Sequence, residues 1–203
     1  MVTRRYLSTL REQSSQRTRE AILDAAAELL ATNGYAKTTL AAVARRAGVA
    51  ANTVYASVGG KAELFLALLE RGTGADVIDE TLTRIDSTAD PRESIALVAF
   101  AYRRSFESAR AVISVLDEAG LHDPAIAAAV DESRRLYRGR LDGVAAHLRS
   151  IGALAPSVGD DEASDVLWFY FGFAAWPQLR ELGWDPDRIE AWLADRAAEA
   201  LLG

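Results

Sequence analysis

The chain has 203 residues, half of them hydrophobic, which is enough to bury a core in one large domain or in two smaller ones. It contains no cysteine, which excludes disulfides, thiolate metal sites and thiol redox sensing. The net charge of −6 is segregated. Residues 1–61 carry nine basic and four acidic side chains, a net +5, whereas residues 62–203 carry 14 basic and 25 acidic ones, a net −11. A basic end on an acidic body indicates contact with phosphate at one end only.

The apolar segments are too short for a membrane protein. The first ten residues lack the apolar core of a signal peptide. The longest uncharged apolar stretch, residues 166–177, would be about 18 Å long as a helix, which is short of a bilayer core. We therefore expect a cytoplasmic protein without a membrane partner.

Helical patterns dominate the chain, because period-two alternation is absent and the strong helix formers Ala, Leu, Glu and Arg are abundant. We predict an all-α protein of about nine helices. The first covers 17–32 and stops at Gly34, since glycine takes the left-handed conformation that ends many helices. The second starts after Thr38, its expected N-cap. The third covers 51–57, and the fourth begins at Lys61.

Three later helices share one start signal, an aspartate before a proline. The carboxylate caps free N–H groups, and proline suits the first helical position. The pairs are Asp90-Pro91, Asp123-Pro124 and Asp185-Pro186, which predict helices over 91–108, 124–150 and 186–202. Two further helices are expected, one near 110–119 and one near 161–181.

Residues 34–64 hold the strongest functional signal. Two short helical patterns are joined by a tight turn, Ala47-Gly48-Val49. This arrangement is typical of a helix-turn-helix, which presents its second helix to the DNA major groove. Three valines can hold the third helix against the first two: Val49, Val54 and Val58. The side chains left on or near its exposed face are Ala51, Asn52, Thr53, Tyr55 and Ala56.

Several of these side chains have the chemistry for DNA contact. Asn52 can bond a base edge or a phosphate, and Thr53 offers a hydroxyl to phosphate or a methyl group to thymine. Thr39 and Lys61 stand at helix starts, where free N–H groups and the helix dipole attract phosphate. Two basic side chains, Arg17 and Arg19, open the first helix. Three more precede it on an arm that could clamp phosphates or enter the minor groove: Arg4, Arg5 and Arg11.

Residues 17–65 resemble the N-terminal domain of the TetR family of bacterial transcriptional regulators. The matching features are Ala-Ile-Leu-Asp-Ala-Ala (21–26), Gly34, Thr38-Thr39, Val43-Ala44, Ala47-Gly48-Val49, Thr53-Val54-Tyr55, Lys61 and Leu64. The resemblance implies that Tyr55 contacts the DNA backbone rather than reads bases. The Trp168 region and residues 182–194 are similar to C-terminal domains of some members, which implies effector binding and dimerisation in residues 66–203.

The resemblance suggests three divisions: a basic arm at 1–16, a three-helix helix-turn-helix domain at 17–65, and a helical ligand-binding and dimerisation domain at 66–203. Three positions depart from the family pattern. Ala50 replaces a usual capping serine, which removes a cap worth roughly 1 kcal/mol. Ala56 stands where a histidine often touches phosphate, and Val58 where a phenylalanine is usual.

The uncharged helix expected at 166–176 indicates dimerisation, because a helix that is apolar all round must be covered all round. One side can pack on its own subunit, and the other needs a partner or a ligand. A two-fold four-helix interface with the last helix is the simplest arrangement. The expected interface residues are Val166, Phe169, Phe173, Trp176, Ile189, Trp192 and Leu193.

Aromatic side chains on three expected helices are candidates for an effector site. Apolar walls with a few hydroxyls suit a small, largely hydrophobic ligand, and the resemblance implies a cavity. The alternative is that these side chains are ordinary core aromatics. The candidates are Phe100, Phe106, Tyr137, Trp168, Tyr170 and Phe171.

The sequence carries no signature of a common enzyme class and no metal-ligand spacing, since His122 and His147 stand far apart. We therefore predict a non-enzymatic, ligand-responsive homodimer without a cofactor that binds double-stranded DNA. It is expected to repress from a palindromic operator until a small hydrophobic effector releases it. The alternative is a helical protein-interaction adaptor whose helix-turn-helix is degenerate.

Overall fold

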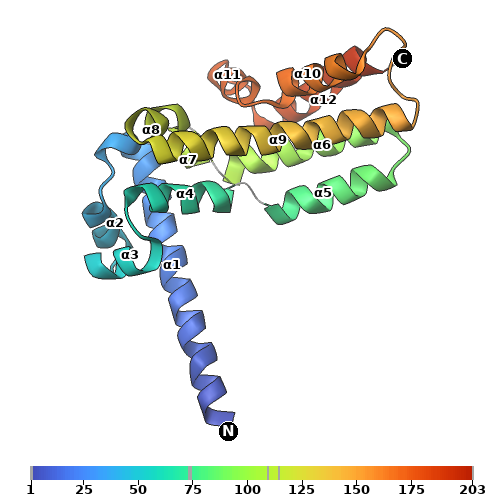
Figure 1. Ribbon diagram of the computed structural model, residues 1–203. Coiled ribbons are helices and arrows are strands. Elements are labelled where there is room, and N and C mark those ends of the chain that lie inside the picture. The colour runs from blue at the N-terminus through green and yellow to red at the C-terminus, as the bar shows by residue number, and fades with distance from the viewer. Residues whose placement is uncertain (1, 73–74, 109, 114, 203) are drawn as a thin grey trace. The chain divides into compact units, whose positions relative to one another are not determined.

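The chain folds into helices, as a computed structural model shows for residues 2–72, 75–108, 110–113 and 115–202 (Figure 1). The expected all-α class is confirmed. The helices of these residues are α1 (Val2–Lys37), α2 (Leu40–Ala47), α3 (Ala51–Val58), α4 (Lys61–Gly72), α5 (Ala75–Ser87), α6 (Pro91–Ser108), α7 (Arg110–Ile113), α8 (Leu116–His122), α9 (Pro124–Ser150), α10 (Asp160–Phe171), α11 (Ala175–Glu181) and α12 (Pro186–Leu201). No described helix combines the length and the hydrophobicity of a bilayer-spanning segment.

Twelve helical segments replace the expected nine or so in the described part of the chain, because three expected stretches are divided. The stretch from Lys61 to Asp90 holds α4 and α5. The helix expected near 110–119 is divided into α7 and α8, and the helix expected at 161–181 into α10 and α11.

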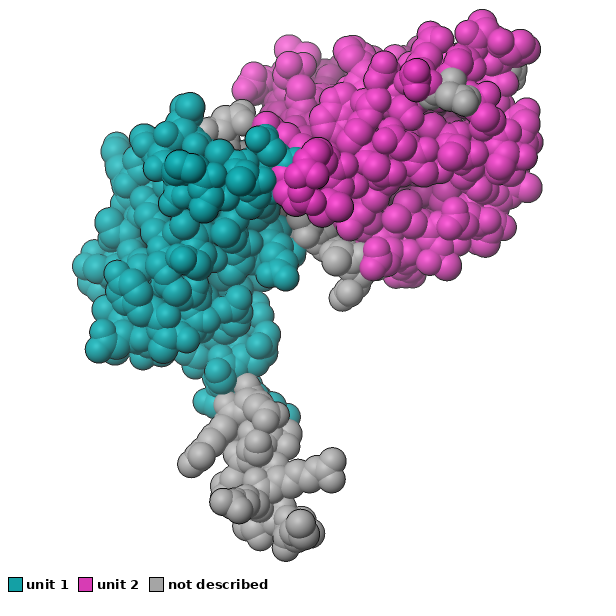
Figure 2. Space-filling view, in the orientation of Figure 1, with its two compact units in different colours: residues 1–73, 109–131 teal, residues 74–108, 132–203 magenta. Residues whose placement is uncertain are grey.

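The chain divides into two compact units (Figure 2). Unit 1 comprises residues 1–73 and 109–131, and unit 2 comprises residues 74–108 and 132–203. The helices α7 and α8 therefore fold with the helix-turn-helix, although more than thirty residues of unit 2 separate these two helices from α4 in the sequence.

In unit 1, α2, α3 and α4 pack on the C-terminal half of α1. Fully buried apolar side chains from all four helices form the core: Ile22, Val43, Val54 and Phe65. Residues 2–16, set apart in the sequence as a basic arm, are helical and continue into the expected first helix. The backbone leaves the helical conformation at Gly34, with φ 75° and ψ 175°, which is where the glycine predicted a stop.

The start of α2 corrects one expectation. The N-cap is Thr39, whose hydroxyl accepts the Ala42 N–H at 3.2 Å. Thr38 is instead buried, and its hydroxyl donates to the Gly34 carbonyl at 2.8 Å. The two threonines are adjacent, so one residue of register decides which hydroxyl faces the free N–H groups of the helix.

The three aspartate–proline starts are confirmed at α6, α9 and α12. Asp90 accepts the N–H of Arg92, Asp123 accepts that of Ala125, and Asp185 accepts that of Arg188. The expected weakness at Ala50 is also confirmed, because α3 begins without any hydrogen bond from a side-chain cap.

In unit 2, α6 packs between α5 and α12, and α10 packs on α12. The helix expected near 161–181 is broken at Gly172, where the extended backbone ends α10. Two tyrosines occupy carbonyls that the break leaves free. The Tyr137 hydroxyl donates to the Phe171 carbonyl at 2.7 Å, and the Tyr102 hydroxyl donates to the Gly172 carbonyl at 2.5 Å.

Candidate nucleic-acid interface and small-molecule cavity

The turn between α2 and α3 is built by one glycine. Gly48 has φ 70° and ψ 29°, a left-handed conformation that L side chains rarely adopt. The turn satisfies carbonyls at the end of α2, since the Val49 N–H donates to Ala44 at 3.0 Å and the Gly48 N–H donates to Arg45 at 3.4 Å. Residues 48–50 separate α2 from α3, which is a short helix of its own (Figure 1).

The two faces of α3 differ sharply. Val54 and Val58 are buried against unit 1, and Val49 ahead of the helix is half-buried. On the other face Tyr55 has 58% of its surface exposed, and Asn52 is exposed too. The remaining candidates follow the same division: Ala51 and Ala56 are exposed and Thr53 is half-buried. The exposed face therefore combines an amide, a phenol and small side chains, which suits close approach to a duplex.

The candidate phosphate contacts fall into two groups. Arg17 and Thr39 are exposed. Arg19 is half-buried, and its guanidinium donates to the Ser57 carbonyl at the end of α3 at 2.5 Å. Lys61 is half-buried as well: its Nζ donates to the Ala36 carbonyl at 3.2 Å and lies 4.1 Å from the centre of the Tyr35 ring. These two basic side chains therefore stabilise the helix-turn-helix by bonds within unit 1.

The carboxylate of Glu118, on α8, binds the backbone at the corner between α1 and α2. Glu118 accepts the backbone N–H groups of Ala36 at 3.1 Å and Tyr35 at 3.3 Å. The hydrogen bond from Ala36 is the main cause that holds the pKa of Glu118 below its ordinary value. The Tyr35 ring also stacks on His122, with 6.4 Å between ring centroids. The α1–α2 corner is therefore fixed by α8, a role for Glu118 that sequence reasoning missed because the two segments lie 82 residues apart.

Residues 22–68, which contain this helix-turn-helix, match the family described as bacterial regulatory proteins, tetR family. This segment of the chain is therefore a TetR-family helix-turn-helix domain. The TetR family is one of transcriptional regulators and not of enzymes. The fatty acid metabolism regulator protein of Bacillus subtilis (strain 168) is 34% identical over 77 residues. Those residues are 38% of this chain and 39% of that curated relative.

Solved structures share the fold of this chain along nearly its whole length. SmeT, the repressor of the Stenotrophomonas maltophilia multidrug efflux pump SmeDEF, has a TM-score of 0.72 at 22% identity and covers 93% of this chain and 92% of its own. NalD, the secondary repressor of the Pseudomonas aeruginosa pump MexAB-OprM, has a TM-score of 0.70 at 24% identity, over 94% and 98%. FadR of Bacillus subtilis in complex with stearoyl-CoA has a TM-score of 0.71 at 19% identity, over 89% and 98%.

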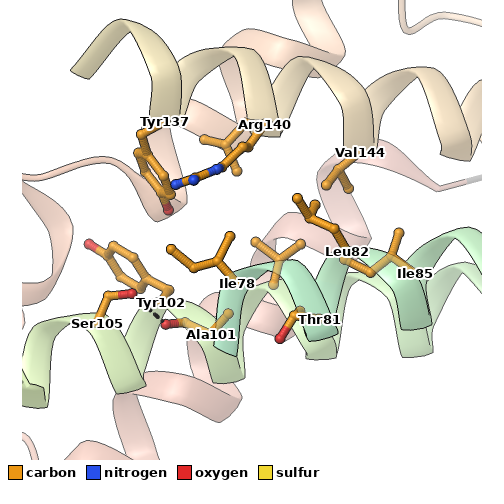
Figure 3. Close-up of a pocket in the computed structure, with 12 residues that line it drawn as sticks. Ile78, Thr81, Leu82, Ile85, Ala101, Tyr102, Ser105, Tyr137, Arg140 and Val144 are labelled. Atoms are coloured by element: carbon orange, nitrogen blue, oxygen red, sulfur yellow. Dashed lines mark hydrogen bonds between the residues drawn. The ribbon is translucent and has the colours of Figure 1, made fainter. Parts of the chain in front are cut away.

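Unit 2 contains a small apolar cavity of about 40 Å³ (Figure 3). Helices α5, α6 and α9 line it. Its lining residues are Ile78, Thr81, Leu82, Ile85, Val98, Ala101, Tyr102, Ser105, Tyr137, Arg140, Leu141 and Val144. Burial is the main cause that raises the pKa of both tyrosines, Tyr102 and Tyr137, so both remain neutral phenols at physiological pH.

The residues expected to bind a ligand are not gathered at this cavity. Of the six, only Tyr137 lines it. Phe106 and Phe171 are buried and contact the Tyr102 ring, with centroids 4.9 Å and 5.7 Å apart. Phe100 is 42% exposed. Trp168 and Tyr170 are half-buried, and Trp168 lies over Tyr137 with 6.1 Å between centroids. Most of these candidate aromatic side chains therefore pack against other aromatic rings.

The expected dimer residues divide by burial. Trp176, Ile189 and Leu193 are buried within the chain itself, which removes them from the proposed interface. The two that stay exposed are Phe169 at 74% and Trp192 at 38%. Val166 and Phe173 are half-buried. Tyr170 links the helices of the two exposed rings, since its ring centroid is 5.2 Å from that of Phe169 and 6.4 Å from that of Trp192.

Metal-binding geometry is absent from the described residues, which hold no group of three or more His, Cys, Asp or Glu side chains suited to an ion. His122 is exposed at the end of α8. His147 is half-buried, and its Nε2 lies 3.1 Å from the Thr88 carbonyl oxygen.

Proposed function

We propose that this TetR-family protein is a ligand-responsive, sequence-specific DNA-binding repressor. The observation that carries the proposal is the exposed face of α3, where Asn52 and Tyr55 project from a helix whose other face is buried. Residues 29–62, which include all of α2 and α3, contain no Asp or Glu, so no carboxylate on this segment opposes the approach of phosphate. We place its action in the cytoplasm, where bacterial DNA is found.

A two-fold dimer would present two copies of α3 about one DNA turn apart, roughly 34 Å, and would select a palindromic or near-palindromic operator. The exposed Phe169 and Trp192 support this assembly. Large aromatic side chains that remain exposed on neighbouring helices are suited to cover by a second copy.

A small, largely hydrophobic effector would act by favouring a conformer that does not fit the operator. The apolar cavity of unit 2 supports this step. Two proteins of the same fold were solved with ligands that carry large apolar groups, SmeT in a complex with triclosan and FadR in a complex with stearoyl-CoA.

Selection of bound duplexes from random DNA with purified protein tests the proposal. We expect enrichment of an inverted repeat with half-sites about 10 base pairs apart, centre to centre. A gel shift on the enriched duplex should weaken steeply as salt rises, because phosphate contacts release counterions. Enrichment of no sequence, together with no salt-dependent shift, would instead favour the adaptor function.

A further inference from the structure

A groove adjoins the apolar cavity of unit 2. It has a volume of about 530 Å³, within the range of small-molecule sites, whereas the cavity has a volume of about 40 Å³. Helices α5 and α9 form the groove. Four residues line both spaces: Leu82, Ile85, Arg140 and Val144. Arg140 is the charged one of the four, so it stands where the two spaces meet.

The hydroxyl groups of the cavity have no proton left for a ligand. Each of the four donates to a backbone carbonyl, and a hydroxyl has a single proton to donate. The bonds run from Tyr102 to Gly172, from Tyr137 to Phe171, from Thr81 to Val77 and from Ser105 to Ala101. A ligand that needs a donor must therefore find it on another side chain.

Arg140 supplies that donor. Its guanidinium carries five N–H groups, and within the described part of the chain it makes no ion pair or hydrogen bond. The nearby acids of α9 are engaged elsewhere, since Glu132 pairs with Arg135 and Asp142 pairs with Arg138. Figure 3 shows the Arg140 side chain extending from α9 toward the ring of Tyr137. A half-buried cation without a counter-ion favours the binding of an anion.

We propose that the effector is an amphiphile with one carboxylate, which binds Arg140 while its apolar body lies along the groove between α5 and α9. This assignment rests on the proposed function and names its effector class. The apolar part of the groove suits such a body, with Leu82, Ile85 and Leu136 among its walls. Asp86 lines the groove but not the cavity, so the head group is expected on the cavity side of Arg140, away from this acid.

Calorimetric titration of the purified protein without DNA tests the assignment. Three probes share one chain length and differ in head charge: decanoate, 1-decanol and decylammonium. We expect decanoate to bind at least about tenfold more tightly than decanol, because a charged hydrogen bond is lost with the neutral head. Decylammonium should bind more weakly still.

Arg140→Met keeps an unbranched apolar stem and removes the charge of the side chain, and it should erase the preference for decanoate over decanol. Arg140→Lys should restore part of that preference. Arg149→Met is the matched control, because Arg149 is exposed on the same helix and lines neither the cavity nor the groove. It should bind all three probes as the parent does. Circular dichroism establishes that each variant is folded.

The assignment is overturned if decanoate does not bind at millimolar concentration, if decanol binds equally well, or if Arg140→Met keeps the preference for decanoate. None of these results touches DNA binding, since no DNA is present in the titration. Failure of the DNA selection, with decanoate binding intact, would instead remove the repressor function and leave the ligand site.

Discussion

At the scale of single residues, we expect DNA binding to depend mainly on two side chains of α3. Asn52 and Tyr55 are exposed, and their exposure follows from their spacing relative to the buried Val54 and Val58. We expect the double variant Asn52→Ala, Tyr55→Ala to abolish operator binding in a fluorescence-anisotropy titration, because amide and hydroxyl contacts to the duplex are lost together. Sedimentation should show an unchanged oligomeric state.

Asn33→Ala is the control for this pair, since Asn33 is exposed at the end of the first helical stretch and not on α3. It should leave the operator affinity unchanged. Retained binding by the double variant would reject α3 as the DNA-reading element.

Glu118 gives unit 1 a predictable response to acid. Backbone hydrogen bonds, chiefly that from Ala36, lower the pKa of Glu118 below its ordinary value of 4.5. A carboxylate whose pKa is lower in the folded state contributes stability above its unfolded pKa, and that contribution is lost as pH falls through the folded pKa. We expect the melting temperature of the parent to fall more than that of Glu118→Gln between about pH 6 and about pH 3.

Thermal melts followed by circular dichroism across this range provide the measurement. Glu107→Gln is a suitable control, because that acid lies on α6 and accepts from arginine side chains rather than from backbone N–H groups. Equal acid sensitivity of the parent and Glu118→Gln would show that the two hydrogen bonds do not stabilise the charged form.

At the scale of elements, the break between α10 and α11 falls at Gly172. A Cβ at this position would lie 2.5 Å from the Trp168 carbonyl oxygen, which is closer than such atoms approach. We expect Gly172→Ala to lower the free energy of unfolding by about 1–3 kcal/mol in urea titrations, because backbone or Trp168 must shift.

Gly143→Ala is the matched control. Gly143 lies within α9, and a Cβ there meets nothing within 4 Å. Alanine should therefore raise the free energy of unfolding by roughly 0.5–1 kcal/mol, since it restrains the unfolded chain and favours helix. A destabilisation by Gly172→Ala no larger than that of a typical surface change would contradict the steric account.

The elements show how far local signals reach. The aspartate–proline starts of α6, α9 and α12 were predictable because a cap acts within four residues of its own backbone. The break at Gly172 was not, because a glycine inside an apolar run is compatible with a continuous helix. What favours the break is the pair of hydroxyls from Tyr102 and Tyr137, which are more than thirty residues away and accommodate the freed carbonyls.

At the scale of the whole molecule, the proposed dimer rests on the aromatic side chains left exposed on α10 and α12. We expect Phe169→Glu combined with Trp192→Glu to convert the dimer to a monomer in sedimentation equilibrium, because two charges would have to be buried at the contact. Operator affinity should fall with it, since one α3 then reads only one half-site.

Leu121→Glu is the control for this pair, because Leu121 is an 86% exposed apolar residue on α8 in the other unit. It should leave the dimer intact. A parent protein that is already monomeric at micromolar concentration would contradict the two-fold assembly.

The sequence by itself determined the helical class, the aspartate–proline helix starts and the two sides of α3, because these depend on side chains within one or two turns of each other. Tertiary structure alone decided which polar groups have partners. The burial of Trp176, Ile189 and Leu193, the bonds of Glu118 at the α1–α2 corner, and the unpaired Arg140 at the cavity are set by segments far apart in the chain. The sequence gives the chemistry of each side chain, but the electrostatic partners of that side chain are neighbours in three dimensions, which no local pattern encodes.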